Sequence, residues 1–353
     1  MADAFDVATR KGLFRFERRA DGWRAGPPDF LGEPVSAYLR DTRDGTEYAA
    51  LKHGHFGCKF HRRLAGGEWA ELATPAYPAG DDASLDMIWT LVAGHDDHPG
   101  RVWAGTLPGG LFRSDDRGES WVLVEDLWNK PERAKWFGGG FDHPGIHSIV
   151  IDPRDADRMA VAVSCGGVWL SRDGGETWAQ GGHGFRAEFL PPDLAGDPVS
   201  QDPHLIAACP AAPDTIWCQH HNGIFVSRDG GDNFVEFRDV DPAVFGFAVV
   251  VHPKDPDRAW FVPGVKDECR VPVDGKLVVT RTTDGGGHFE AFGQGLPDPA
   301  YDIVFRHAMA IDATGDHLVM GSSTGNLWSS EDGGESWALV SHALPPIAQV
   351  DFG

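Results

Sequence analysis

The chain is poor in cysteine, and the cysteines that it has follow no pairing pattern. Among 353 residues there are five. They are odd in number and have no Cys-x-x-Cys spacing, so a disulfide framework is not expected. We predict a cytosolic protein with free thiols at Cys58, Cys165, Cys209, Cys218 and Cys269.

Basic residues and long apolar runs are scarce as well. Lysine and arginine number 31 against 53 aspartates and glutamates, which gives a formal net charge of −22. Nucleic acids and anionic membrane surfaces would be repelled by such a chain, so neither is expected as a main partner. No apolar stretch follows Met1, and no run is long enough to cross a bilayer. Helical periodicity is also scarce, whereas 45 glycines and 25 prolines suit short strands and tight turns.

A short phrase recurs along the chain, with a hydroxyl residue, an aspartate, paired glycines and an aromatic residue in fixed order. A clean copy reads Ser171-Arg-Asp173-Gly-Gly175-Glu-Thr177-Trp178, between two β-like runs. Asp and Ser side chains bond to backbone N–H groups in turns, and glycine supplies positive φ. A period of roughly fifty residues is typical of stacked supersecondary units. We therefore predict a structural, hairpin-closing role for the repeated aspartates Asp116, Asp173, Asp229, Asp284 and Asp332.

The closing aromatic residues predict the number of units. Five copies end at Trp121, Trp178, Phe234, Phe289 and Trp337, and degenerate copies upstream end at Trp23 and Trp69. Seven anchors predict an all-β fold: a seven-bladed β-propeller of four-stranded antiparallel blades, forming one domain over residues 1–353. A second phrase, at 151–158 and 251–258, fits the turn between the innermost strand and the next.

The two ends of the chain are predicted to close the ring. Residues 5–8 align with the second strand of later blades, whereas residues 347–352 resemble an innermost strand. The C-terminal strand should therefore complete the N-terminal blade, which leaves no exposed sheet edge at the seam.

The repeated phrase resembles the Asp-box, or BNR repeat, of sialidases and related β-propellers. A bacterial cytosolic group that is called sialidase-like or glycosyl hydrolase from its repeats alone is similar over almost the whole chain. The resemblance implies a pocket on the rim opposite the repeated turns. The long connections 126–145 and 182–203 and the insertion 263–275 are expected on that rim, where long loops are commonly functional.

Polar side chains are concentrated on the same predicted rim. At least seven histidines are expected to point toward one mouth, with Asp202 and Arg306 beside two of them. In the first interpretation, imidazoles from several blades bind a divalent metal of unknown identity near the axis. The candidate ligands are His147, His204, His307 and one of His220 or His221, for which His221 is preferred.

The second interpretation is a sialidase-type glycosidase. Sialidases pair a tyrosine nucleophile with a carboxylate, and the resemblance implies Tyr301 as the nucleophile here. Arg10, Arg270 and Arg306 would supply a cationic cluster for a substrate carboxylate. The N-terminal arginine motif typical of sialidases is absent.

The third interpretation is a non-catalytic scaffold that holds a protein or peptide partner. Aromatic residues of the long loops would form its surface, or a lid over a small ligand: Trp128, Trp136, Phe137, Phe185 and Phe189.

Among the three, the pattern favours an enzyme of hydrolase or lyase type that acts on a small polar or anionic ligand, with metal assistance left open. The proton-transfer group would be Asp202, Glu268 or a histidine, with Tyr301, Arg306 and Asp267 nearby.

Overall fold

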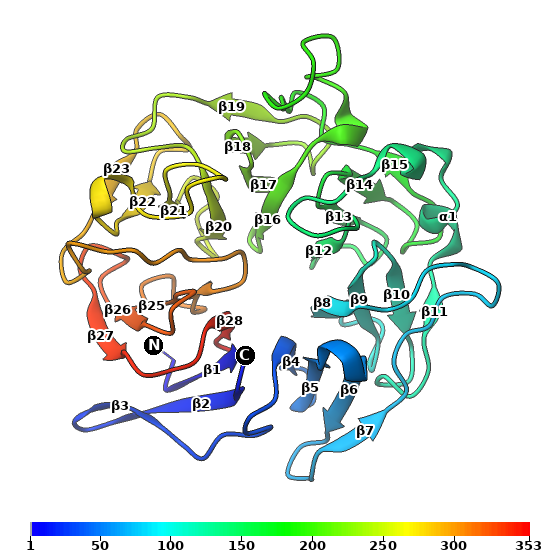
Figure 1. Cartoon of the computed structure of the whole chain (residues 1–353), viewed down its shortest axis with the longest axis horizontal. Coiled ribbons are helices and arrows are strands. Elements are labelled where there is room, and N and C mark those ends of the chain that lie inside the picture. The colour runs from blue at the N-terminus through cyan, green and yellow to red at the C-terminus, as the bar shows by residue number, and fades with distance from the viewer. Residues whose placement is uncertain (1) are drawn as a thin grey trace.

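Seven four-stranded antiparallel sheets stand around a common axis (Figure 1), as the repeats predict. The computed structural model describes residues 2–353. Each sheet is one blade, and its first strand faces the axis. The repeated phrases lie between the third and fourth strands of their blades, and the second phrase lies between the first and second.

The strands of each blade, from the axis outward, have the following bounds. Blade one contains β28 (Ile347–Asp351), β1 (Ala4–Thr9), β2 (Gly12–Arg19) and β3 (Gly22–Ala25); blade two contains β4 (Val35–Asp41), β5 (Thr46–Lys52), β6 (Cys58–Arg63) and β7 (Ala70–Leu72); blade three contains β8 (Met87–Ala93), β9 (Val102–Leu107), β10 (Leu111–Ser114) and β11 (Val122–Leu123). Blade four contains β12 (Ile146–Ile151), β13 (Met159–Val163), β14 (Gly167–Ser171) and β15 (Ala179–Gln180); blade five contains β16 (Pro203–Cys209), β17 (Ala212–His220), β18 (Gly223–Ser227) and β19 (Val235–Phe237). Blade six contains β20 (Gly246–Val251), β21 (Ala259–Pro263), β22 (Val279–Thr282) and β23 (Glu290–Phe292); blade seven contains β24 (Met309–Ile311), β25 (Leu318–Gly321), β26 (Leu327–Ser330) and β27 (Ala338–Ser341).

Helices are short and confined to connections. They are α1 (Glu125–Trp128), η1 (Gly54–Phe56), η2 (Pro131–Lys135), η3 (Pro198–Ser200) and η4 (Val273–Gly275). None of the helices within residues 2–353 has the length and apolarity needed to span a bilayer. All five cysteines are unpaired.

The C-terminal strand closes the ring as predicted. β28 pairs antiparallel with β1 and forms the inner strand of blade one. Its backbone also reaches blade seven, because Val350 N donates to the His307 carbonyl at 2.9 Å. On the other side, the Gln349 side chain bonds to both the N–H and the carbonyl of Tyr38 in blade two, at 2.9 and 2.8 Å. One strand thus joins three consecutive blades.

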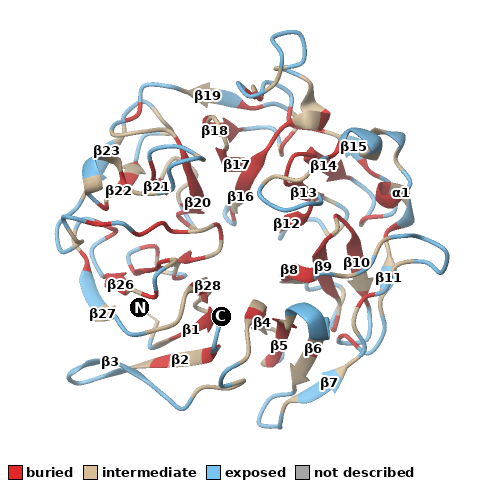
Figure 2. Cartoon of the chain, in the orientation of Figure 1, coloured by how far each residue is buried: buried red, intermediate tan, exposed pale blue. Residues whose placement is uncertain are grey.

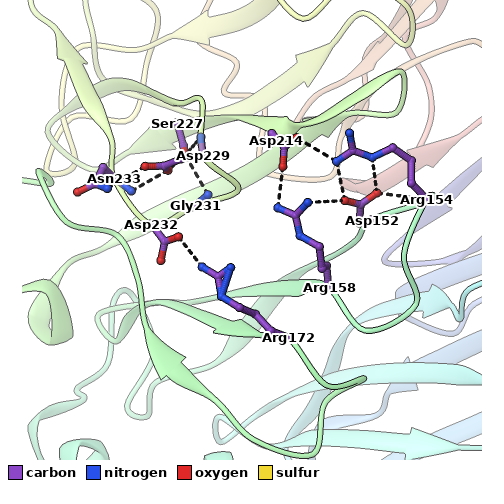
Figure 3. Close-up of polar contacts among 10 residues, drawn as sticks. All are labelled: Asp152, Arg154, Arg158, Arg172, Asp214, Ser227, Asp229, Gly231, Asp232 and Asn233. Carbon is purple, nitrogen blue, oxygen red and sulfur yellow. Dashed lines mark hydrogen bonds and ion pairs between the residues drawn. The ribbon is translucent and has the colours of Figure 1, made fainter.

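The repeated turn has the same hydrogen bonds in each clean copy. In blade five, Ser227 Oγ donates to Asp229 Oδ1 at 2.8 Å and accepts from Gly231 N at 2.9 Å. Asn233 N donates to the same Asp229 oxygen at 2.9 Å (Figure 3). Equivalent bonds hold the other four turns, so each of the repeated aspartates bonds within its own hairpin.

The second glycine of the turn has a further role that the sequence analysis missed. A Cβ atom on Gly175 would lie 2.7 Å from the Trp103 ring of the preceding blade, and one on Gly118 would lie 2.7 Å from Phe60. On Gly334 it would lie 2.9 Å from Trp260. These glycines therefore permit blade-to-blade packing as well as the turn conformation.

Gly175→Ala should lower the free energy of unfolding by about 2 kcal/mol more than Gly174→Ala, because both alanines would have positive φ but only the first would overlap the preceding blade. Urea denaturation of the two variants beside the wild type measures this difference. Equal losses in both variants would show that the turn conformation alone requires glycine.

Ion pairs link neighbouring blades beside these turns. Arg172 pairs with Asp232 of the next turn at 2.5 Å (Figure 3). Arg113 pairs with Glu176 and Arg281 with Glu335 in the same relation, at 2.9 and 3.1 Å. The acidic residue after the paired glycines thus has a recurring partner, although exposed pairs of this kind contribute at most about 1 kcal/mol each.

Burial increases from the outer strands toward the inner and middle ones. Figure 2 shows buried residues along the first to third strands of most blades and exposed ones on the fourth strands and loops. Trp103, Trp169, Trp217 and Trp260 are among the largest fully buried side chains. These aromatic residues lie on the second or third strands, where two neighbouring blades pack together.

His317 is buried at the seam between blades seven and one. Its ring stacks on Trp23 at 5.3 Å and contacts Phe352 at 4.9 Å, and neither ring nitrogen has a hydrogen-bond partner within residues 2–353. Burial lowers the pKa of His317, against the opposing effect of Asp312 and Glu331.

This histidine should make the seam sensitive to acid. The folded state holds the ring neutral, so its contribution to stability is complete above the unfolded pKa of about 6.5 and is lost as the pH falls below it, by at most about 1.4 kcal/mol per pH unit. His317→Phe should unfold less readily at pH 5 and show a shallower decline between pH 7 and 5. Urea midpoints across this range provide the measurement, and an unchanged slope in the variant would refute the assignment.

Candidate functional site

A cavity of about 840 Å³ opens at the axis on the face opposite the repeated turns. All seven blades line it, through the entries to their innermost strands and the connections between second and third strands. The long connection 126–145 contributes residues 137–141. The location agrees with the rim predicted from the repeats.

Arg306 is the most unusual residue of the cavity wall. It precedes β24, is 8% exposed, and lies between the rings of Trp89 and Phe247, at 5.0 and 5.4 Å from their centroids. Among residues 2–353 no carboxylate forms an ion pair with it, and its buried Nε has no hydrogen-bond partner. Burial lowers the pKa of the Arg306 guanidinium to about 10, which still leaves it charged at neutral pH. The protein therefore holds a buried positive charge without a direct counter-ion.

The cavity is cationic although the chain is acidic. Four basic side chains line it, Arg10, Lys52, Arg270 and Arg306, against two carboxylates, Asp202 and Asp267. Asp267 pairs with Arg270 at 2.6 Å, and Lys52 pairs with Asp86 outside the cavity at 2.7 Å. The three arginines considered for a substrate carboxylate are thus brought to one cavity, and Arg10 and Arg306 have no acidic partner among the described residues.

Asp202, His204 and His221 form a compact cluster in the wall of blade five. His204 Nε2 lies 3.4 Å from Asp202 Oδ2, and His221 Nδ1 lies 3.3 Å from the same oxygen. The other oxygen, Oδ1, accepts a hydrogen bond from Cys165 N at 3.2 Å. One potential ligand atom from each of the three residues lies within 4.8 Å of the others, so the cluster can hold a metal ion.

The surroundings of the cluster control its charge. Burial alone would raise the pKa of Asp202, but His204, His221 and Arg306 hold it well below its usual range. Burial lowers the pKa of His204, against the opposing effect of Asp202. An ionised carboxylate with an adjacent neutral imidazole is the arrangement that proton transfer or metal binding requires.

Two of the four predicted metal ligands lie outside this cluster. His147 is fully buried beside the Trp89 ring and its Nδ1 contacts Ser148 Oγ at 2.9 Å. His307 lines the cavity, but its Nε2 donates to the His147 carbonyl at 2.8 Å. Burial lowers the pKa of both rings, to about 4 for His307. The structure thus groups His204 and His221 with Asp202 and leaves His147 and His307 in backbone and packing contacts.

Fewer histidines lie at the mouth than the seven or more that the sequence predicted. Only His204, His221 and His307 line the cavity among residues 2–353. His220 is buried behind the cluster against Phe185, because it ends β17 with its side chain turned into the blade.

Tyr301 and Glu268 are not brought to the cavity. Tyr301 is 74% exposed and lines a separate hollow with Asp302 and Trp328. The Glu268 side chain is exposed at the tip of the sixth-blade insertion, where it pairs with Lys266 at 3.6 Å. Their positions in the sequence were consistent with a catalytic role, but the loops that carry them direct both side chains to solvent.

The aromatic residues of the long loops separate into two groups. Trp128, Trp136 and Phe185 are buried against the blades, whereas Phe137 and Phe189 are partly exposed, line the cavity and contact each other edge to face at 6.2 Å. Phe141, with 40% of its surface exposed, joins them at the rim.

Several site residues were missed in the sequence analysis. Trp89 and Phe247 lie within inner strands and read as ordinary core residues. Cys165 has a positive φ of 48° and lines the wall, and Gly139 allows the loop to approach it, since a Cβ there would lie 2.9 Å from its Sγ. The glycine run 138–140 in a long loop was the available signal.

No protein-family model matches the chain. An oligoxyloglucan-reducing end-specific xyloglucanase from Emericella nidulans is 25% identical over 251 residues, which cover 69% of this chain and 26% of that protein. The crystal structure of a GH74 xyloglucanase from Xanthomonas campestris aligns with a TM-score of 0.66 and 18% identity, over 96% of this chain and 52% of that one. A structure of YCF48 bound to D1 peptide aligns with a TM-score of 0.56 and 13% identity, over 92% and 88% of the two chains.

These similarities show the propeller fold. The chain spans about a quarter of the Emericella nidulans xyloglucanase and about half of the Xanthomonas campestris one.

Proposed function

We propose that the protein is an enzyme of hydrolase or lyase type that acts on a small organic anion bound in the axial cavity. The unpaired, buried Arg306 carries this proposal. Burial disfavours the charged guanidinium, Asp202 stabilises it only from beyond ion-pair distance, and an anionic ligand in the cavity would add a direct partner. A carboxylate or a phosphate matches the planar donor set of an arginine.

The remaining wall supports a ligand that is anionic at one end and less polar at the other. Arg10 adds positive charge to the cavity wall, Arg270 lies over the Phe247 ring, and Phe137, Phe141 and Phe189 offer ring faces and edges at the rim. Ligand sites commonly combine an apolar lining with a few convergent polar groups. The reacting bond would lie against Asp202, His204 and His221, which supply a carboxylate and two imidazoles either for proton transfer or for holding a metal that activates the reacting group.

Glycoside-hydrolase-type chemistry is the form of this proposal that the similarity to xyloglucanases supports. As part of the same proposal, the repeated turns are of the Asp-box type found in sialidase-like propellers. We do not extend the proposal to a sialidase mechanism through Tyr301, because its phenol group lies outside the cavity.

Ligand binding by wild type and Arg306→Met tests the proposal. Calorimetry and thermal shifts would be recorded with hexuronates, sugar phosphates and sialic acid, each beside its neutral sugar, in phosphate-free buffer at low salt. At least one anion should bind the wild type, its neutral counterpart should not, and the variant should lose affinity by at least ~100-fold, the loss expected for a bidentate charged contact.

Arg238→Met is the matched control, since it removes the same charge from an exposed position paired with Glu236. It should bind the anion as the wild type does. Equal affinity in Arg306→Met, or a wild type that binds none of the anions, would overturn the proposal.

A non-catalytic peptide-binding scaffold is the second candidate. The alignment with peptide-bound YCF48 covers most of both chains, and the exposed phenylalanines at the mouth offer a surface. In that case Asp202→Asn and His204→Ala would leave the function intact, whereas changes at Phe137 and Phe189 would remove it.

A further inference from the structure

The hydrogen bond of His204 leaves a lone pair facing a carboxylate. His204 Nδ1 lies 2.6 Å from the Gly246 carbonyl oxygen. A carbonyl oxygen can only accept, so Nδ1 carries the proton, and in a neutral ring Nε2 is then unprotonated. This nitrogen faces Asp202 Oδ2 at 3.4 Å. Both side chains are almost fully buried, and a cation at this position, either a proton on Nε2 or a metal ion, would join the two groups.

His221 completes a set of three ligands. Its Nδ1 lies 3.3 Å from the same Asp202 oxygen, and the three atoms lie within 4.8 Å of one another. In a tetrahedral site with bonds of 2.0–2.1 Å, ligand atoms are separated by about 3.3 Å. Both separations from Asp202 match this value, and the two histidine nitrogens lie within 4.8 Å of each other.

The surrounding contacts hold the ligands in place. The Gly246 carbonyl orients His204, whose ring also stacks on Phe247 at 4.5 Å, and Cys165 N holds the second oxygen of Asp202. A second hydrogen bond of this kind fixes the tautomer of a ligating histidine in known metal sites. All three ligands line the cavity, so the remaining coordination positions would be accessible from it.

We propose that Asp202, His204 and His221 bind one divalent first-row transition-metal ion through a carboxylate oxygen and two imidazole nitrogens. This ligand set suits zinc, manganese, iron(II), cobalt or nickel. The role of the metal rests on the proposed function. An anion held by Arg306 would also reach the metal ion, and the ion would then polarise the anion or activate a water molecule. It replaces the set of four histidines that the sequence predicted.

Metal content of the untagged full-length chain tests this inference. The protein would be stripped with a chelator, loaded separately with each of the five ions and analysed by mass spectrometry of the elements after desalting. The cobalt(II) form would also be examined by its visible d–d absorption. One ion per chain is expected in the wild type, with affinity reduced at least ~100-fold in His204→Ala and His221→Ala and at least ~10-fold in Asp202→Asn.

Three control variants make the result specific. His307→Ala removes a cavity histidine outside the cluster, His143→Ala removes an exposed one in the loop 126–145, and Arg306→Met removes the anion site. All three should retain the ion. Circular dichroism and urea midpoints would show whether each variant is folded. If an alanine variant does not fold, Asp202→Asn still tests the site, because asparagine keeps the shape of the aspartate side chain.

The outcomes separate this inference from the proposed function. No retained ion in the wild type, or an ion retained equally in all variants, would overturn the metal site. Anion binding that depends on Arg306 in the metal-free protein would leave the proposed function standing in that case. Conversely, an ion bound by the cluster without any anion binding would support the metal site and overturn the proposed function.

Discussion

Deletion of residues 346–353 should prevent the chain from forming a closed, cooperatively folded ring. The deletion removes β28 and with it the inner partner of β1, the Gln349 contacts to Tyr38 and the backbone bond to His307. Burial of Ile347 and Val350 alone is worth about 3–6 kcal/mol. Because whole domains are stable by about 5–15 kcal/mol, the loss should abolish cooperative urea unfolding and cause aggregation through the exposed edge of β1.

A graded control is available within the same strand. Val350→Ala should retain the fold and lower the free energy of unfolding by about 1–3 kcal/mol, since it removes buried methyl groups and leaves the backbone pairing intact. A truncated chain with a sharp unfolding transition near that of the wild type would show that the ring does not depend on this strand.

Arg306→Met should stabilise the ligand-free protein while it abolishes anion binding. The guanidinium is buried without an ion pair, and its contacts with Trp89 and Phe247 offset only part of the desolvation cost. Methionine would keep the packing against both rings without the charge. We expect the free energy of unfolding to rise by about 1–2 kcal/mol in phosphate-free buffer, as measured by urea denaturation.

Arg270→Met is the comparison for this effect, because Arg270 lines the same cavity but pairs with Asp267 and is partly exposed. Its stability should change by less than about 0.5 kcal/mol. A destabilised Arg306→Met would mean that Asp202 compensates the charge of Arg306 in the ligand-free protein, and would contradict an uncompensated charge at this position.

The repeats made the architecture predictable because one turn performs one task in every blade. The aspartates of the turns, the seven anchors and the closing strand all follow from local patterns and from the need to pair sheet edges. The second glycines were understood only in part. Their contacts cross to the preceding blade, as between Gly175 and Trp103, and no local pattern encodes which residue will lie opposite.

The sequence allowed us to predict which face of the propeller carries the cavity, but not which side chains point into it. Asp202, His204 and Arg306 were expected on the rim that lines the cavity because the entries to innermost strands share it, and His221 because the connections between second and third strands lie there too. His147 is turned into the core and Tyr301 into solvent, and both directions depend on the local course of a connection. Arg306 is unusual because no carboxylate among the described residues forms an ion pair with it, and the sequence alone does not show which side chains lie around a residue.

The cationic mouth within an acidic protein has a consequence for the rate at which a ligand enters. At a distance, an anion meets the field of a chain with net charge −22 and is repelled, whereas inside the cavity it meets Arg306 between two rings. Added salt screens the first interaction beyond a Debye length of about 10 Å and screens the buried contact far less. Association should therefore become faster as ionic strength rises, the reverse of the usual behaviour for oppositely charged partners. Large polyanions would be kept outside by the same field, so charge selects for small ligands before shape does.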